Sequence, residues 1–188
     1  MSTRDIVYIA LFAAIVGALG LFPPIVLPLI GVPITAQSLG VMLAGSVLGA
    51  RRGGLAILLF LVLVAIGVPL LAGGRGGFGV FLGPSGGFLF GWPIAAFAIG
   101  WMIERSWSRL DVWRGFVINV VGGIAVMYAF GIPWIAIAAE ISLWQAAIGV
   151  MGFVPGDVIK AAAAAFVAVT VKRAYPIIGQ AEPRTGRA

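Results

Sequence analysis

The chain has 188 residues, of which 62% are hydrophobic and only 10% are charged. Soluble domains carry about 25% charged residues, so a soluble enzyme, a nucleic-acid-binding domain and a disordered protein are poor interpretations. The net charge is +6, but the basic residues lie between apolar runs, which is typical of a membrane protein. The chain contains no Cys and no His, which excludes disulfides, His/Cys metal sites and Ser-His or Cys-His catalytic pairs.

Six apolar segments have about the length of a membrane-spanning helix. They cover residues 6–22, 35–50, 55–71, 87–103, 115–130 and 157–171. We expect Arg51-Arg52-Gly53-Gly54 to separate the second and third segments, and Gly131-Ile132-Pro133 to end the fifth. Residues 134–153 are apolar but contain Glu140, which favours an interfacial helix or a loop. The pattern predicts an all-α integral membrane protein with one domain, residues 1–188, and a polar tail at 175–188.

The positions of Lys and Arg decide the number of spans. If there are six spans and both termini are cytoplasmic, 10 of the 12 basic residues lie on the cytoplasmic side: Arg4, Arg51, Arg52, Arg105, Arg109, Arg114, Lys172, Arg173, Arg184 and Arg187. Arg75 then lies outside, and Lys160 lies within the last span. A seventh span at 134–153 would move the basic residues of the tail to the outside. The positive-inside rule therefore favours six spans in the cytoplasmic membrane.

Asp157 and Lys160 are the charged pair best placed to carry chemistry. They are three residues apart, so they share one face of the last predicted helix. A charge at membrane depth costs about 2.5–3.5 kcal/mol, which makes a functional role the default hypothesis. One interpretation is a polar ligand held by the carboxylate and the ammonium side by side. The alternative, with equal weight, is that Asp157 caps the helix and Lys160 extends to the membrane interface.

Arg75 lies in a glycine-rich loop, where five of the eight residues 73–80 are glycine. Glycines let backbone N–H groups approach a ligand closely, and Arg75 could receive a carboxylate. A flexible connector with a solvated arginine is the alternative. At the start of the second segment, Thr35 or Gln37 could bond a ligand, although capping of the helix is the favoured interpretation.

Small residues and aromatic residues form two weaker patterns. Ala10, Ala14 and Ala18 recur every four residues in the first segment, and such faces let helices approach closely, either within the protein or with a partner. Most tryptophans flank the segments, as in an interfacial belt. Phe78 and Trp134 lie near the predicted outer loops and could instead stack on a ligand.

Four groups of residues, in order along about residues 5–175, resemble the BioY family of biotin-specific substrate-binding subunits of energy-coupling-factor (ECF) vitamin transporters. They are VPITAQSLG at 32–40 with LGARRG at 48–53, GVPLLAG at 67–73 with Gly76-Gly77, GPSGGFLFGW at 83–92, and FVPGDVIK at 153–160. Ser85 departs mildly from the family, in which a threonine is commoner at that position. Phe78 stands where the family often has a tyrosine-like ring.

The resemblance implies the six-helix fold of an ECF substrate-binding subunit (S-component) and a vitamin site near the outer face, closed by the loop between the first two helices. It implies that Asp157 and Lys160 hold the ureido ring of biotin, and that Gln37 and Phe78 line the site. Arg75 is assigned to the carboxylate of biotin from its charge and its side of the membrane.

The resemblance also implies partners, namely a transmembrane coupling subunit and two ATPases, which dock on the face of Ala10 and Ala14. We expect no cofactor in this chain. It has no Walker A motif, so ATP would be used only by the partner subunits.

Three alternatives remain open at this point. The chain could be an S-component for another vitamin, such as thiamin or riboflavin. It could be a membrane-embedded enzyme with Asp157 and Lys160 as an acid–base pair, or a small channel.

Overall fold

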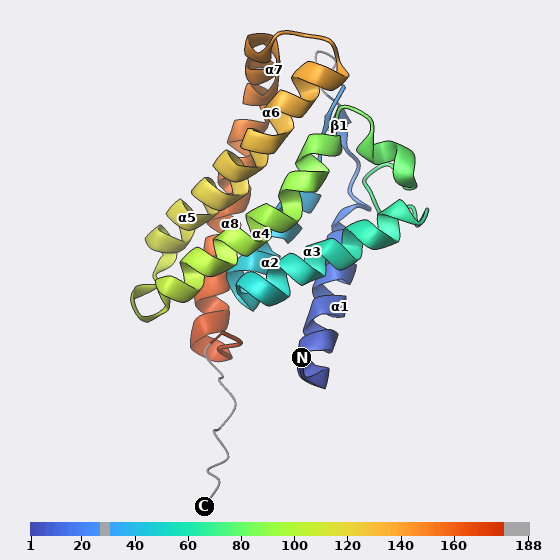
Figure 1. Ribbon diagram of the computed structural model, residues 1–188. Coiled ribbons are helices and arrows are strands. Elements are labelled where there is room, and N and C mark those ends of the chain that lie inside the picture. Colours follow the sequence, from blue (N-terminus) through green and yellow to red (C-terminus); the bar gives the residue numbers. More distant parts are fainter. Residues whose placement is uncertain (27–30, 179–188) are drawn as a thin grey trace, which may run out of the picture.

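The computed structural model describes residues 1–26 and 31–178. The predicted tail beyond residue 178, with Arg184 and Arg187, lies outside the described residues. Over the described residues the helices group into six segments, as expected (Figure 1). The first four are α1 (Thr3–Leu19), α2 (Gln37–Leu48), α3 (Ala50–Ala65) and α4 (Gly86–Arg105).

The last two segments are each built from shorter pieces. The fifth runs through α5 (Val112–Val120), the π-helical stretch η3 (Val121–Val126) and α6 (Met127–Ala138). The sixth runs through α7 (Leu143–Val150), the 3-10 turn η4 (Met151–Phe153) and α8 (Val154–Ala174). Short 3-10 turns, η1 (Phe78–Phe81) and η2 (Trp107–Arg109), lie in the loops before α4 and α5.

Among the described residues, three continuous helical stretches are long and apolar enough to cross a membrane: Gly86–Arg105, Val112–Ala138 and Leu143–Ala174. The helices α1 and α3 have 17 and 16 residues, whereas α2 has only 12. At 1.5 Å per residue, α2 is about 18 Å long, which is shorter than the hydrocarbon core of a bilayer. It packs against α1, α3, α4 and α8 and is buried along most of its length. The molecule is therefore organised around α2.

Some predicted boundaries are wrong. The third segment was predicted to run to residue 71, but α3 ends at Ala65, just before Gly67 with its φ of +108°. Pro133 does not end the fifth segment, because the helix continues to Ala138. Residues 134–153 are accordingly neither one interfacial helix nor one loop: they complete α6, turn, and form α7 and η4, which lead into α8. Proline is tolerated inside a membrane helix when neighbouring groups compensate for the lost hydrogen bond, and this explains the missed continuation.

The predicted separation at Arg51–Gly54 is also wrong. These residues form the first turns of α3, which follows α2 after Gly49 alone. Gly49 has a φ of +85°, which allows the sharp reversal. A Cβ on Gly53 would lie 2.7 Å from the carbonyl oxygen of Ala44, so glycine is needed where α3 crosses α2. These glycines serve close helix packing rather than a loop.

The N-terminus of α1 and the C-terminal end of α8 lie at the same end of the molecule (Figure 1). Arg52 forms a 2.7 Å ion pair with Asp5 and donates a hydrogen bond to the carbonyl oxygen of Ile177. Lys172 likewise donates to the carbonyl oxygens of Trp107 and Leu110. The arginine pair and the charged loop before α5 thus lie at the end that holds both described chain ends, as six spans require.

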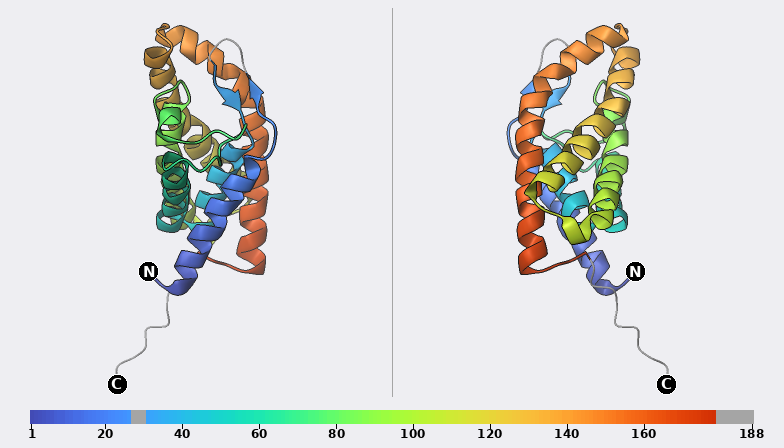
Figure 2. Two further views of the ribbon diagram at one scale, coloured as in Figure 1. Left: turned by 90° about the vertical axis from the view of Figure 1, so that its right-hand side faces the viewer. Right: turned by 90° about the vertical axis from the view of Figure 1, so that its left-hand side faces the viewer.

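The loop between α1 and α2 carries a small hairpin at the opposite end. Its strands β1 (Ile25–Val26) and β2 (Pro33–Ile34) pair antiparallel, with Ile25 opposite Ile34. Both views in Figure 2 show the hairpin beside the upper part of the α7–α8 segment. The hairpin brings Thr35 and the start of α2 against α8.

Candidate functional site

Asp157 and Lys160 meet at the start of α8, as predicted from their spacing. The helix begins after the 3-10 turn η4, and Pro155 occupies its first turn, where proline is favoured. Lys160 Nζ lies 2.9 Å from Asp157 Oδ1, and the two side chains are only 15% and 8% exposed. The pair is therefore a buried ion pair inside the helical bundle.

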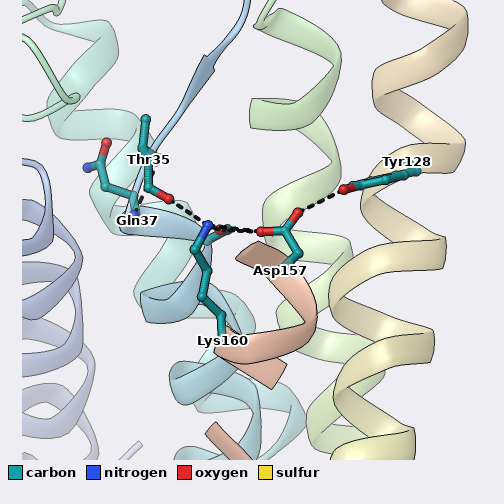
Figure 3. Close-up of polar contacts among 6 residues, drawn as sticks. Thr35, Gln37, Tyr128, Asp157 and Lys160 are labelled. Atoms are coloured by element: carbon teal, nitrogen blue, oxygen red, sulfur yellow. Dashed lines mark hydrogen bonds and ion pairs between the residues drawn. The ribbon is translucent and has the colours of Figure 1, made fainter. Parts of the chain in front are cut away.

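Side-chain and backbone groups of other segments form hydrogen bonds with this pair (Figure 3). Lys160 Nζ also donates to the carbonyl oxygen of Thr35 at 2.8 Å and to Ser38 Oγ at 2.9 Å. The Ser38 hydroxyl donates to Asp157 Oδ1 at 3.2 Å, and the Tyr128 hydroxyl donates to Asp157 Oδ2 at 2.9 Å. The cluster therefore joins the loop before α2, α2 itself, α6 and α8.

The structure contradicts the alternative of a capping aspartate and an interfacial lysine. The residue before the first turn of α8 is Phe153, so Asp157 is not the N-cap. Lys160 turns inward to Thr35 instead of extending along the helix to the membrane interface. Breaking a buried ion pair by removing one partner costs about 3–5 kcal/mol, so this arrangement constrains the site strongly.

A cavity of about 580 Å³, part of it open to solvent, borders the cluster. Its polar wall includes Thr35, Ser38, Arg75, Ser85, Asp157 and Lys160. Aromatic side chains form much of the remainder: Phe88, Trp92, Tyr128 and Phe153.

The aromatic wall is held by ring packing. The Phe88 ring meets the Tyr128 ring edge-on, with centroids 5.9 Å apart, and meets the Phe153 ring at the same centroid distance. Such arrangements are favourable because the positive ring edge faces the negative ring face. The cavity thus combines a rigid apolar wall with a few convergent polar groups.

Arg75 borders the cavity from a short turn. The backbone N–H groups of Leu71 and Arg75 donate to each other's carbonyl oxygens, at 3.0 and 3.1 Å, and Arg75 Nε donates to the carbonyl oxygen of Ala72. Partial burial lowers the pKa of the Arg75 guanidinium, but an arginine remains a cation at neutral pH. These hydrogen bonds hold the turn in place, so it is not the flexible connector that the sequence left open as an alternative.

The other predicted site residues divide into two groups. Ser85 and Gln37 border the cavity together with Asp157, Lys160 and Arg75. Phe78 and Trp134 do not line it. Phe78 is 67% exposed and packs on Phe81, whereas Trp134 Nε1 donates to the carbonyl oxygen of Gly83.

The small residues of α1 lie together on one exposed face of the helix, as their spacing in the sequence predicts. Ala10, Ala14 and Ala18 are exposed, while Ile9, Ala13 and Val16 pack inward. The face is therefore open to contact with lipid or with another helix.

Comparisons with known proteins place this architecture in a family. The model of the BioY family matches residues 1–177. The chain belongs to the BioY family. The family membership predicted from the four motif groups is confirmed.

Named BioY relatives are similar over nearly the whole chain. The biotin transporter BioY of Rhizobium etli is 52% identical over 183 residues, which cover 95% of this chain and 98% of that protein. The biotin transporter BioY of Rhodobacter capsulatus is 49% identical over 183 residues, covering 92% and 95%. These relatives are transporters and not enzymes.

A solved structure has the same fold. The crystal structure at 2.1 Å of the S-component for biotin from an ECF-type ABC transporter matches with a TM-score of 0.87 and 31% sequence identity. The match covers 92% of this chain and 95% of that one. The predicted all-α S-component fold is confirmed.

Two polar side chains of this cavity, Ser38 and Tyr128, were not predicted from the sequence. Ser38 follows Thr35 by three residues, and both carry a hydroxyl group at the start of the second apolar segment, which was a usable signal. Tyr128 is a hydroxyl-bearing residue in an otherwise apolar stretch, where an unpaired polar group would be costly, and this was a usable signal.

The site of this BioY chain can therefore bind three kinds of group. Asp157 can accept N–H donors, and Lys160 can donate to a carbonyl oxygen in place of one of its three partners in this structure, Thr35, Ser38 and Asp157, so together they suit an amide or urea. Arg75 suits an anionic group, with a charge-assisted hydrogen bond. The aromatic wall accommodates an apolar body between them.

Proposed function

We propose that this chain is the biotin-binding S-component of an ECF-type transporter, located in the cytoplasmic membrane with both termini in the cytoplasm. The buried Asp157–Lys160 pair at the cavity wall is the observation that carries this proposal. Six helical segments with the described chain ends at one end support the orientation, because the arginine-rich loops lie at that same end.

The chemistry of biotin fits the cavity group by group. Its ureido ring has two N–H donors and one carbonyl oxygen, which match the Asp157 carboxylate and the Lys160 ammonium. Its carboxylate pairs with Arg75, and Ser85 supplies a hydroxyl to the same wall. The fused ring system packs against Phe88 and Trp92.

Charge explains why the site selects an anion. Asp157, Lys160 and Arg75 give the cavity wall two positive charges and one negative charge. A ligand with one negative charge neutralises this excess, whereas a cation such as thiamin would be repelled. Biotin is such an anion at neutral pH.

The loop between α1 and α2 closes the site. Val32, Pro33, Ile34 and Thr35 belong to this loop and form part of the cavity wall. Opening of the loop would admit biotin from the outside, and the Thr35–Lys160 hydrogen bond holds the closed state. Release into the cytoplasm then needs reorientation of the chain, driven by ATP hydrolysis in partner subunits.

Equilibrium binding of labelled biotin to the purified chain in detergent tests this function. We expect one tightly bound biotin per chain, displaced by unlabelled biotin but not by thiamin or riboflavin. Displacement by thiamin or riboflavin, or failure of the folded chain to bind biotin, would overturn the assignment.

The docking role of α1 has its own test. Ala14→Trp fills the small-residue face, so we expect normal biotin binding but a loss of biotin uptake when the coupling subunit and ATPases are co-expressed. Ala162→Trp, on an exposed position of α8, is the matched control and should leave uptake unchanged. Equal uptake by the Ala14→Trp variant and the wild type would reject docking at this face.

A further inference from the structure

Gln37 borders the cavity, but its side chain is occupied by the backbone of other segments. It is only 1% exposed. Its Nε2 donates to the carbonyl oxygens of Val16 and Leu70, both at 3.0 Å, and its Oε1 accepts from the N–H of Ala72 at 2.9 Å. A side-chain amide has two N–H donors, so Gln37 has none left for a ligand.

On one side, Gln37 completes the end of α1. The last carbonyl oxygens of a helix have no partner within the helix. The N–H of Gly20 bonds to Gly17 rather than continuing the regular pattern to Val16, and Gln37 supplies the partner for Val16. A Cβ on Gly20 would lie 3.0 Å from Gln37 Nε2, so the end of α1 is in close contact with this amide.

On the other side, Gln37 holds the turn that carries Arg75. Leu70 and Ala72, the two residues bonded to Gln37, flank Leu71. Leu71 and Arg75 are bonded to each other through their backbones, and both border the cavity. The position of the Arg75 guanidinium therefore depends on the Gln37 amide, first through the bonds of Gln37 to Leu70 and Ala72 and then through the backbone pairing of Leu71 with Arg75.

We propose that Gln37 is a positioning residue that joins the Arg75 turn, residues 70–75, to the C-terminal end of α1. It sets the position of the Arg75 guanidinium without contacting the ligand, and it makes the cavity wall and the partner-docking helix move together. This inference rests on the proposed function for the role of Arg75 in holding the biotin carboxylate. The connection between the turn and α1 stands independently of the ligand.

A double-mutant cycle tests the action through Arg75. Gln37→Leu removes all three hydrogen bonds, and we expect about a tenfold loss of biotin affinity. In an Arg75→Gln background the same change should cost at most about twofold, because the guanidinium it positions is gone. A loss of equal size in both backgrounds would overturn the proposal, as would unchanged affinity in the single variant.

Ser46→Ala is the matched control for this cycle. Ser46 lies on the same helix and is equally buried, but it bonds to Asn119 and not to the turn. We expect its effect on biotin affinity to be less than about twofold in either background. A loss as large as that of Gln37→Leu would mean that any buried polar change on α2 disturbs the site, and would overturn the specific role of Gln37.

A distance measurement tests the connection without ligand. The sequence has no cysteine, so spin labels at Ala18→Cys on α1 and Gly79→Cys beyond the turn report one distance. Both positions are exposed, and a Cβ at Gly79 meets no atom within 4 Å. We expect a narrow distance distribution that broadens or shifts in Gln37→Leu and stays narrow in Ser46→Ala. An unchanged distribution in Gln37→Leu would contradict the connection.

Gly20→Ala provides a second variant if Gln37→Leu does not fold. It keeps Gln37 but places a methyl group against its amide nitrogen and against Leu70, so the label distance should shift. An unshifted distance would again contradict the connection. If the spin-label distance changes in these variants but the labelled wild-type chain binds no biotin, the connection between the turn and α1 stands and the proposed ligand is rejected.

Discussion

Two polar groups of residues buried along α2 make an instructive comparison. The charged cluster consists of Ser38, Tyr128, Asp157 and Lys160, and it borders the cavity. The neutral pair consists of Ser46 and Asn119, two turns further along α2. Ser46 Oγ donates to Asn119 Oδ1 at 3.0 Å, and Asn119 Nδ2 donates to the carbonyl oxygen of Gly115 at 2.8 Å.

Both groups are fully hydrogen-bonded and both tie α2 to later helices, but their energetic demands differ. Neutral polar groups inside a membrane bundle cost little once they are paired, and they contribute about 0.6 kcal/mol to packing. Charged groups carry a desolvation penalty that pairing offsets only in part. Hydrogen bonding alone therefore does not mark a binding site in this molecule, whereas a buried charged group beside a cavity does.

Asp157→Asn should produce the largest effect on biotin binding. The change leaves the Lys160 ammonium buried without its counter-charge and weakens the acceptor for the ureido N–H groups. We expect affinity to fall by about 3 kcal/mol, roughly a hundredfold or more, in equilibrium binding of labelled biotin. An unchanged dissociation constant would remove Asp157 from the site and break the comparison at its charged end.

Tyr128→Phe should produce an intermediate effect. The ring keeps its edge contact with Phe88, but Asp157 Oδ2 loses the hydroxyl that orients it. We expect affinity to fall by about 1 kcal/mol, roughly fivefold. To separate orientation from packing, the same change is made in the Asp157→Asn background, where it should have little further effect. A full additional loss there would indicate that Tyr128 acts by packing alone.

Ser46→Ala should leave biotin affinity unchanged while lowering stability. It removes one neutral hydrogen bond far from the charged cluster, so we expect a loss of about 0.6 kcal/mol in the free energy of unfolding, seen as a lower melting temperature in detergent. A tenfold loss of biotin affinity would show that the neutral pair also serves the site, and the comparison would no longer hold.

The sequence was sufficient for the features that depend on composition and short spacing. Apolar segments predicted the six helical segments, and the three-residue spacing of Asp157 and Lys160 predicted that they share one helix face, where the structure shows them in contact. The positions of arginines predicted that the chain ends and charged loops share one end. These features follow from local periodicity or from the charge balance of whole segments.

The features that escaped prediction depend on long-range geometry. Tyr128 reaches Asp157 only after the π-helical stretch at residues 121–126, where each wider turn adds a residue and rotates all later side chains about the axis. Phe78 was expected in the site from its loop, but η1 places it on the outside. Gln37 was expected to contact the ligand. Its side-chain amide instead donates to the carbonyl oxygens of Val16 and Leu70, which lie 21 and 33 residues away along the chain.

The most direct test of the central claim is a structure of this chain with biotin bound. We expect the ureido nitrogens within about 3 Å of the Asp157 carboxylate, the ureido oxygen on Lys160, and the carboxylate of biotin on Arg75. Biotin bound in the reverse direction, or at a place away from the Asp157–Lys160 pair, would contradict it.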